Sequence, residues 1–509
     1  MSGLLVAPVV LPIVAAATMV LLRRLPPTAR HGFGLIATLA FIGIALVLFG
    51  RAADGTTETL LLGNWRAPFG IVLVLDRLSA WMLLLTAFVG AATLIAAIAG
   101  GHARKLHFHP LFQIQLAGVA GAFLTGDLFN LFVCFEVLLA ASYGLLLYSG
   151  ERQTRRASLH YITFNLVGSL LFLIAAGLIY GVTGTLSFAE LASIGSQLPE
   201  ADVPLLRAAM LLLLVVFSIK AAALPLGLWL PATYGAADAP VAALFALLTK
   251  VGIYAVIRVF VGVFGAMEPS TPWIYLAGAI PWVGALTLLF GAFGALAARH
   301  LRGIAASLIL ASAGTLLIAA GLPGGVAAAM YYAAHSTLAG AALFLVADAI
   351  RRGRGEASDR LEPAMAVGRA GLLGGMFFVV AVAIAGLPPL TGFIGKAMLL
   401  AEVFAQPGRA HLAVAVLLGS LTTLLALARA GTLLFWQTTP HRADEHVRRG
   451  GRGDLWGAWL LLGGLVLLTV AAGPAQRYLS ALAEQVASTR IVAAGVLGTL
   501  PRPQGARQP

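Results

Sequence analysis

Three lysines stand inside long apolar stretches of this sequence, where little water can stabilise a positive charge. Lys220 and Lys250 lie near the middle of two consecutive stretches, and Lys396 follows a Gly-Leu-Pro-Pro break that begins at Gly386. Only four of the 33 Lys and Arg residues are lysines, so nearly all the remaining positive charge is arginine. Lysine can release its proton when it is desolvated, whereas arginine cannot readily do so. This distribution predicts that protons are the cargo.

Two further ionisable residues lie deep in apolar sequence. Glu136 is too far inside the run 129–148 for its short side chain to reach water easily, so it should face other helices or pair with a charge. Lys220 is the expected partner, because an ion pair offsets part of the desolvation cost. His335 lies midway along another run, and imidazole suits a proton relay between lysines. Lys250 has no acid in its own run, which favours a role in proton transfer.

Each of these residues also has a purely structural interpretation. The pair of Glu136 and Lys220 could be a static link, and His335 could only hydrogen-bond between helices. Lys396 is close enough to a helix break to snorkel or to cap a helix. It does not belong to a phosphate-binding loop, because Leu390 and Ala397 stand where that loop needs glycine and a hydroxyl residue. Four other charged residues near the ends of runs are expected to be boundary residues: Asp127, Arg258, Asp348 and Glu402.

Composition assigns the chain to the polytopic membrane proteins. It has 509 residues, is 60% hydrophobic and only 10% charged, and has a mean hydropathy of +0.95. A soluble globule needs far more surface charge. The runs are continuous, not alternating, and each crossing needs roughly 20 apolar residues, so the fold class is all-α. The single cysteine, Cys134, lies in an apolar run, which excludes a disulfide framework and a thiolate metal site.

The hydropathy pattern predicts about fourteen transmembrane helices. The first run has no small-residue cleavage signal and is expected to be retained as a helix. An even number of crossings places both termini on the same side of the membrane. The predicted spans are 3–22, 33–50, 75–99, 110–127, 129–148, 158–181, 205–230, 240–263, 273–297, 302–321, 325–349, 371–403, 411–436 and 455–473.

Loop charge predicts the orientation. The net charge of +13 comes from arginines in short loops between spans, so it reflects topology and not nucleic-acid binding. Alternate loops are acidic or neutral, and the loop 231–239 is the exception, since it should be cytoplasmic but carries only Asp238. With basic loops inside, both termini face outward. The basic loops begin at Arg23, Arg104, Arg152, Arg299, Arg351 and Arg442.

Prolines inside two spans indicate internal symmetry. Pro225 follows Lys220, and Pro388 and Pro389 precede Lys396. Proline in a spanning helix removes a backbone donor and usually breaks or kinks it, and paired breaks are typical of inverted repeats around a polar path. Simple packing kinks are the alternative. We therefore predict an N-terminal three-helix segment, two inverted five-helix repeats, a last helix and a C-terminal tail, at 1–100, 110–263, 273–436, 455–473 and 474–509.

Several motifs together resemble one family, the antiporter-like proton-translocating subunits shared by respiratory complex I and Mrp-type sodium/proton antiporters. The resemblance covers roughly residues 75–436 and is strongest to the D-type subunits of Mrp complexes. Complex I relatives often have histidine after the Trp-Leu-Pro motif, whereas this chain has Thr233-Tyr234, which favours the Mrp branch. The motifs are Leu128 to Glu136 with Ser142-Tyr143, Trp229-Leu230-Pro231, Ala239 to Leu244, Leu248 to Tyr254, and Ala385 to Phe393 with Lys396.

The resemblance implies roles for the buried residues. Glu136 and Lys220 would form the coupling pair, Lys250 the central proton carrier and Lys396 the terminal carrier. His335 would relay protons, although several relatives carry a lysine where this chain has Gly340. The family needs no cofactor or metal. Expected partners are the A, B, C, E, F and G types of Mrp subunit, together with protons, Na⁺ (or K⁺ or Li⁺) and the lipid bilayer of a bacterial inner membrane.

The sequence therefore predicts a proton-translocating subunit of a multi-subunit monovalent cation/proton antiporter. Such a subunit is a secondary transporter and not an enzyme. The alternative is a proton-pumping membrane-arm subunit of a redox complex, such as complex I or a membrane-bound hydrogenase. No motif here binds flavin, quinone or an iron–sulfur cluster, but an arm subunit would not need one. A third possibility, a self-contained solute transporter, lacks a recognisable substrate pocket.

Overall fold

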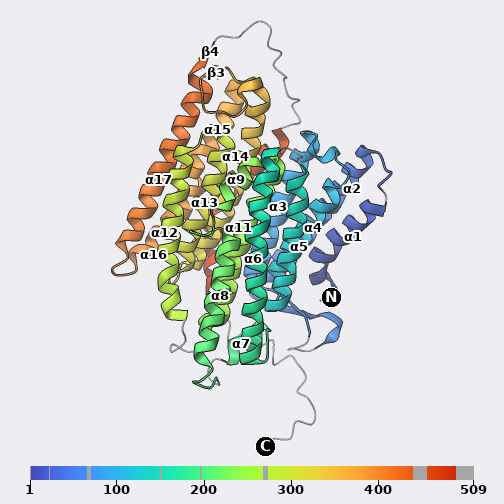
Figure 1. Cartoon of the computed structure of the whole chain (residues 1–509), viewed down its shortest axis with the longest axis vertical. Coiled ribbons are helices and arrows are strands. Elements are labelled where there is room, and N and C mark those ends of the chain that lie inside the picture. Colours follow the sequence, from blue (N-terminus) through green and yellow to red (C-terminus); the bar gives the residue numbers. More distant parts are fainter. Residues whose placement is uncertain are drawn as a thin grey trace, which may run out of the picture.

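The computed structural model describes residues 2–21, 23–65, 70–148, 152–194, 198–266, 273–439 and 455–488. These residues form an elongated bundle in which most helices run roughly parallel to one long axis (Figure 1). The predicted basic loop 442–452 lies outside the described residues. The all-α prediction is confirmed, because the strands form only two small two-stranded sheets within the described ranges.

The N-terminal segment contains three helices and a hairpin. The short strands pair antiparallel, with Glu58 opposite Leu75. Its elements are α1 (Ala7–Leu21), preceded by η1 (Ser2–Val6), then α2 (Pro27–Ala52), β1 (Glu58–Leu61), η2 (Leu62–Asn64), β2 (Val72–Leu75) and α3 (Arg77–Ala99).

The next part of the chain contains the first broken helix. The span predicted at 205–230 forms α8 and α9 with a break between them, and the span predicted at 240–263 divides into α10, α11 and a π-helix. The elements are η3 (His102–Arg104), α4 (Phe108–Leu124), α5 (Leu128–Leu147), α6 (Arg152–Thr183), α7 (Phe188–Ile194), α8 (Val203–Ala221), α9 (Trp229–Ala236), α10 (Ala239–Phe245), α11 (Leu248–Ala255), the π-helix η4 (Val256–Val263) and η5 (Phe264–Ala266).

The last part contains the second broken helix, α15 and α16. Strands β3 and β4 pair in parallel, with Ala364 opposite Thr438. The elements are α12 (Trp273–Ala297), α13 (Leu301–Ala320), α14 (Val326–Gly353), η6 (Gly355–Ala357), β3 (Ala364–Met365), α15 (Ala370–Ala385), α16 (Thr391–Phe404), α17 (Ala410–Gly431), the π-helix η7 (Thr432–Trp436), β4 (Thr438–Thr439), α18 (Trp456–Val470) and α19 (Ala472–Ala487).

The membrane-protein prediction is confirmed by helix length and composition. Among the described residues, eleven helices are long and apolar enough to cross a membrane, or twelve if α18 and α19, which meet at 78°, count as one span. Two further apolar helices, α4 and α15, are shorter. Every predicted span coincides with one or more helices, but the total of fourteen crossings stays a prediction.

Burial divides the bundle into a centre and two edges. In α13, α14 and the segment from α10 to η4, 89–94% of the most apolar window is buried, against 33% in the helices that begin the chain. α1 and α2 stand at one edge and α17 at the other (Figure 1). The central helices are apolar all round because protein surrounds them, whereas the edge helices present an apolar face outward.

The two broken helices run in opposite directions. α8 lies low and α9 high in the view, whereas α15 lies high and α16 low (Figure 1). Each break begins at a residue with left-handed backbone, Ala222 (φ 59°) and Gly386 (φ 83°). The breaks predicted at Pro225 and at Pro388-Pro389 are therefore present. Opposite directions are what inverted repeats require, although the repeat boundaries remain predictions.

The C-terminal segment predicted as a tail begins with a helix. α19 buries Leu479, Leu482 and Val486. Its Gln485 side chain accepts a hydrogen bond from the backbone N–H of Arg77 at the start of α3, over 3.1 Å. The Tyr478 hydroxyl donates to the Arg77 carbonyl over 3.1 Å. These bonds fasten α19 to α3.

Candidate functional site

The structure brings Glu136 and Lys220 together through a serine. Ser169 of α6 donates a hydrogen bond to the Glu136 carboxylate, and Lys220 Nζ donates to the same Ser169 hydroxyl over 3.4 Å. Nζ also donates to the Asn165 carbonyl over 3.4 Å. Within the described helices no direct ion pair joins the two charges. The predicted contact between carboxylate and ammonium is therefore indirect, with one hydroxyl between them.

The end of α8 places Lys220. Lys220 is in the last turn of this helix and is 5% exposed. The left-handed Ala222 ends the helix, and its N–H and that of Ala223 donate to the Ile219 and Ser218 carbonyls. A cation in the last turn of a helix is stabilised by the carbonyl ends of its peptide dipoles. The Phe135 ring centroid, 5.8 Å from Nζ, adds a weaker attraction.

Lys250 occupies the most enclosed position of the three lysines. It is 1% exposed and lies in the first turn of α11, just after the short interruption that separates this helix from α10. Its Nζ donates to the Ser312 hydroxyl of α13 over 3.0 Å. Ser312 in turn donates to the Ile309 carbonyl over 2.7 Å. The Lys250 side chain therefore has one neutral hydroxyl as its hydrogen-bond acceptor, and no carboxylate of the described residues pairs with it.

Gly252 brings the helix of Lys250 against that of Lys220. A Cβ at Gly252 would lie 2.4 Å from the Ala221 nitrogen and 2.7 Å from the Lys220 carbonyl carbon. Only a glycine permits this approach, because any side chain would overlap the backbone of α8. The two lysines thus sit on helices whose backbones are in direct contact.

His335 lies between the central and the last lysine. Its Nδ1 is 2.8 Å from the Thr391 hydroxyl at the start of α16. The histidine is 1% exposed and within electrostatic range of both Lys250 and Lys396. Further along α14, a Cβ at Gly340 would lie 2.4 Å from Ile309. At Gly340, α14 therefore packs closely against the Ile309 side chain of α13.

Lys396 is held by backbone. Its Nζ donates to the carbonyls of Ile384 and Ala385 over 3.2 and 2.8 Å, and these carbonyls end α15 on the far side of the break. The lysine is half-buried. A Cβ at Gly386 would lie 2.7 Å from Lys396 Cδ, so the glycine leaves the space that the side chain crosses. Lys396 therefore also caps α15, as its helix-capping interpretation predicted.

Followed from contact to contact, the five predicted residues form a row. Ser169 links Glu136 to Lys220, Gly252 joins the helices of Lys220 and Lys250, and His335 is in electrostatic range of Lys250 and Lys396. The row passes from α5 and α8, through α11, to α14 and α16, with oxygen acceptors from α6 and α13 beside it. Buried cations bonded to neutral oxygens can hold and release protons, and each changes the charge felt by the next. Within the described residues no group of three or more His, Cys, Asp or Glu side chains is placed to hold a metal ion.

The hydroxyl acceptors could not be selected from sequence. Ser169, Ser312 and Thr391 are three of many Ser and Thr residues in apolar runs, and nothing in their spacing distinguishes them. Their distance from the lysines along the chain explains this, since Lys250 and Ser312 are 62 residues apart. Only tertiary packing brings them together.

Arg258 is more than a boundary residue. Its guanidinium forms two hydrogen bonds with the carboxylate of Asp76, which also caps α3, and its Nε donates to the Tyr254 hydroxyl over 3.0 Å. The side chains of Arg258 and Asp76 are 14% and 6% exposed. Arg258 follows Lys250 in the same span, so a satisfied ion pair occupies this end of it. Asp127, by contrast, caps α5 as a boundary residue would.

A charged cluster lies at the opposite end, beside the basic loops. His102 lies 3.6 Å from Asp238 and 3.8 Å from Asp348. Arg351 and Arg352 pair with Asp348 at 2.8 and 3.0 Å. Burial would lower the pKa of His102, but hydrogen bonds and attraction from the two carboxylates outweigh it and raise this pKa to about 9. Residues 231–236, predicted as part of a loop, belong to α9. Asp238, just after α9, meets His102 and Lys105 of a basic loop, which accounts for its exceptional charge.

A bundle of long apolar helices of this kind defines a polytopic membrane protein. The family model described as NADH:quinone oxidoreductase/Mrp antiporter, transmembrane, matches residues 125–426. The chain belongs to this family, as its motifs predicted.

Full-length relatives give the same result. The chain is 39% identical to a Rhizobium meliloti protein described as the probable D subunit of a K⁺/H⁺ antiporter, covering 96% of each chain. It is 35% identical to the D subunit of an Na⁺/H⁺ antiporter from Bacillus subtilis, covering 96% of this chain and 97% of the relative. A chain in the structure of the Mrp complex from Dietzia sp. DQ12-45-1b superimposes with a TM-score of 0.85 at 26% identity, covering 98% of this chain and 99% of the other.

Proposed function

We propose that this chain is the proton-translocating D-type component of an Mrp monovalent cation/proton antiporter, acting as part of a transporter and not as an enzyme. The row of Glu136, Lys220, Lys250, His335 and Lys396 is the observation that carries this proposal. The two antiporter relatives from Rhizobium meliloti and Bacillus subtilis match nearly the whole chain, which supports the antiporter role over a redox-complex arm.

The row would work by electrostatic coupling. A proton that arrives at Glu136 removes the negative charge that favours the ammonium form of Lys220, so Lys220 becomes a better donor. Loss of charge at Lys220 favours protonation of Lys250 across the Gly252 contact. His335 and Thr391 then lie on the way to Lys396. Water would have to complete the steps between lysines, because no direct hydrogen bond joins the described lysine sites to one another.

The exchanged ion is a monovalent cation, Na⁺ or K⁺. One of the two relatives is named for K⁺/H⁺ exchange and the other for Na⁺/H⁺ exchange, and both cations fit the same proton row. The cation would cross with the help of partner subunits of the A, B, C, E, F and G types. The likeness to a chain of an Mrp complex supports such an assembly.

The expected location is the bacterial inner membrane, with the charged cluster around His102 on the cytoplasmic side. Arginines of the basic loops and the ion pairs of Asp238 and Asp348 meet at this end, in agreement with the positive-inside rule. The Asp76–Arg258 pair would then close the outer end of the span that contains Lys250. Both termini would face outward.

Replacement of Lys250 by alanine tests the proposal. In inverted vesicles that contain the whole complex, we expect Lys250→Ala to reduce cation-driven proton movement at least ~100-fold, since a positioned proton carrier typically contributes that much. The composition of the purified complex should be unchanged. Exchange at a normal rate would overturn the central role of Lys250. Proton movement driven only by an electron donor would instead assign the chain to a redox complex.

A further inference from the structure

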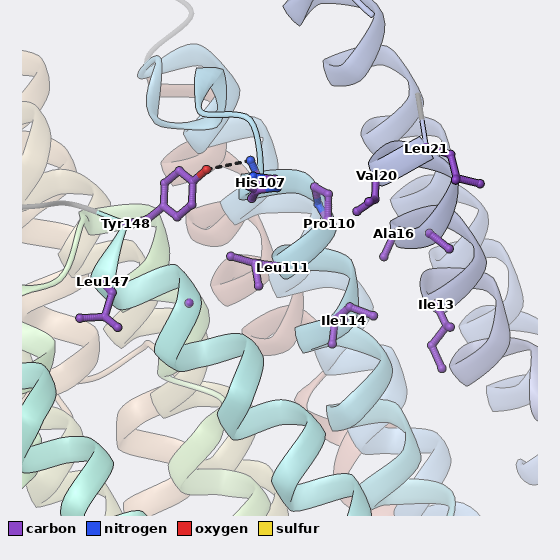
Figure 2. Close-up of a pocket in the computed structure, with 12 residues that line it drawn as sticks. Ile13, Ala16, Val20, Leu21, His107, Pro110, Leu111, Ile114, Leu147 and Tyr148 are labelled. Atoms are coloured by element: carbon purple, nitrogen blue, oxygen red, sulfur yellow. Dashed lines mark hydrogen bonds between the residues drawn. The ribbon is translucent and has the colours of Figure 1, made fainter. Parts of the chain in front are cut away.

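A cavity of about 870 Å³ lies outside the proton row, between α1, α4 and α5. Ile13 and Val20 of α1 line one side, and Leu111 and Ile114 of α4 line the other (Figure 2). Ile13 and Val20 are 41% and 48% exposed, so the cavity is open to the surroundings of the bundle. Its volume is within the roughly 300–1,000 Å³ of sites that hold a small molecule. The walls are almost entirely apolar.

The polar side of the cavity lies at one end. Tyr148 follows the last turn of α5, and its hydroxyl accepts a hydrogen bond from the His107 N–H over 2.9 Å (Figure 2). Lys105 Nζ lies 5.4 Å from the Tyr148 ring centroid and is partly exposed. Leu21, at the end of α1, lines the same end. Three helix ends therefore form a polar rim, where a membrane interface would place it.

Arginines flank the rim residues Leu21 and His107 along the chain. Arg23 and Arg24 follow α1 closely and are exposed, as is Arg104 in the turn before α4. The described loops 23–26 and 100–107 contain no acidic residue. Lys105 is 4.0 Å from Asp238, which leaves the three arginines in excess at this end. The N-terminus of α4 points its amide dipoles toward the same rim.

We propose that this cavity binds an anionic phospholipid, with its acyl chain between α1 and α4 and its phosphate at the basic rim. An apolar wall with positive charge at one end matches an amphiphile with a negative head, and basic pockets between spanning helices bind such headgroups. A helix of a partner subunit is the alternative occupant, and it would need a carboxylate at the depth of the basic rim. None of the lining residues belongs to the proton row, so the site is separate from it.

The test measures lipid binding directly on the purified complex. Photoreactive phosphatidylglycerol, with the reactive group in its acyl chain, is compared with phosphatidylcholine of the same chains, and cross-linked peptides are identified by mass spectrometry. We expect phosphatidylglycerol to label α1 and α4. The double variant Arg23→Gln/Arg24→Gln should reduce this labelling by roughly fivefold per charge removed. Arg207→Gln, which removes an exposed arginine of α8 instead, should leave it unchanged.

Filling the cavity gives a second test. Ile114→Trp should reduce labelling of α1 by both lipids, whereas Leu173→Trp, on the exposed face of α6, should not. If Ile114→Trp prevents assembly, the arginine variants still decide. Equal labelling by the two lipids, or labelling unaffected by the arginine variants, would overturn the proposal. Cross-links between a partner subunit and the cavity residues would show a protein interface there and would also overturn it.

Discussion

The two broken helices hold their lysines in different ways. At the first break Lys220 precedes the interruption, is almost fully buried, and reaches a carboxylate through the Ser169 hydroxyl. At the second break Lys396 follows the interruption, is half-buried, and bonds to two backbone carbonyls of the preceding helix. The same local design, an apolar helix that ends at a left-handed residue, therefore provides two kinds of cation site.

The two lysines differ in whether the charge around them can change. Backbone carbonyls keep the same dipole at every pH, so the environment of Lys396 is fixed unless the helices move. A carboxylate can gain a proton, so the environment of Lys220 changes with the charge of Glu136. We infer that the first break is where an incoming proton alters the row, and that the second mainly accepts and releases what arrives.

Arginine at each lysine position should separate a proton carrier from a structural cation. Arginine keeps the positive charge and can still bond to Ser169 or to the α15 carbonyls, but it does not release its proton. We expect Lys220→Arg and Lys396→Arg to assemble normally and to lose proton movement at least ~100-fold. Vesicle pH measurements check this. Normal exchange by Lys396→Arg would show that this lysine only caps α15. The second break would then not contain a proton carrier.

Removing the carboxylate should affect only the first break. Glu136→Gln keeps the shape of the side chain but not its charge, so we expect exchange, measured in the same vesicles, to fall about tenfold, as a coupling between two sites typically does. Ser169→Ala should have a smaller effect of the same kind. Glu402→Gln on α16 is the matched control and should be close to wild type. An equal loss in Glu136→Gln and Glu402→Gln would contradict a special role for the first break.

The cluster at the cytoplasmic end offers a comparison outside the spans. Because the folded-state pKa of His102 is raised from 6.5 to about 9, its protonation stabilises the fold fully below pH 6.5, and this contribution is lost as the pH rises through about 9. We expect His102→Gln to lower stability by roughly 1–3 kcal/mol in acid and much less above that range. Thermal unfolding of the purified complex against pH checks this, with His160→Gln as control. A difference independent of pH would contradict the ion-pair account.

The smallest effects should come from the residues that begin the breaks. Alanine at position 386 would have to adopt φ 83° with its Cβ 2.7 Å from Lys396 Cδ, so Gly386→Ala should cost about 1–2 kcal/mol. Ala222 already tolerates φ 59°, so Ala222→Gly should be neutral or stabilise by less than about 1 kcal/mol. Circular dichroism melts distinguish the two. If both substitutions destabilised the protein, left-handed backbone alone would not explain the two positions, and the two breaks would differ in local structure.

The elements that depend on a local sequence pattern can be predicted from the sequence. The helices coincide with continuous apolar runs, and the breaks occur where Pro225 and Pro388 stand. The row of ionisable residues was identifiable because charge inside apolar sequence is rare. The family motifs then agreed with that row.

What sequence could not supply depends on contacts between distant residues. Arg258 and Asp76 are 182 residues apart, so their pairing has no local signal. The interruption between α10 and α11 contains no proline or glycine. It cannot be predicted from the sequence, because it lies inside one continuous apolar run. The sequence does not predict α19 as a spanning helix, because only one face of it is apolar. The Gly252 contact and the cavity beside α1 likewise exist only after packing.

The bond between Arg77 and Gln485 also bears on how the protein is made. The two residues are separated by 408 positions, so the start of α3 receives this partner only when nearly the whole chain has been synthesised. At roughly 5–20 residues per second, the ribosome needs about 20–80 seconds to cover that distance. During this time the early helices are in the membrane without their final fastening. A nascent chain that stops before α19 would therefore leave this end of α3 open to the membrane surface and to quality-control proteases.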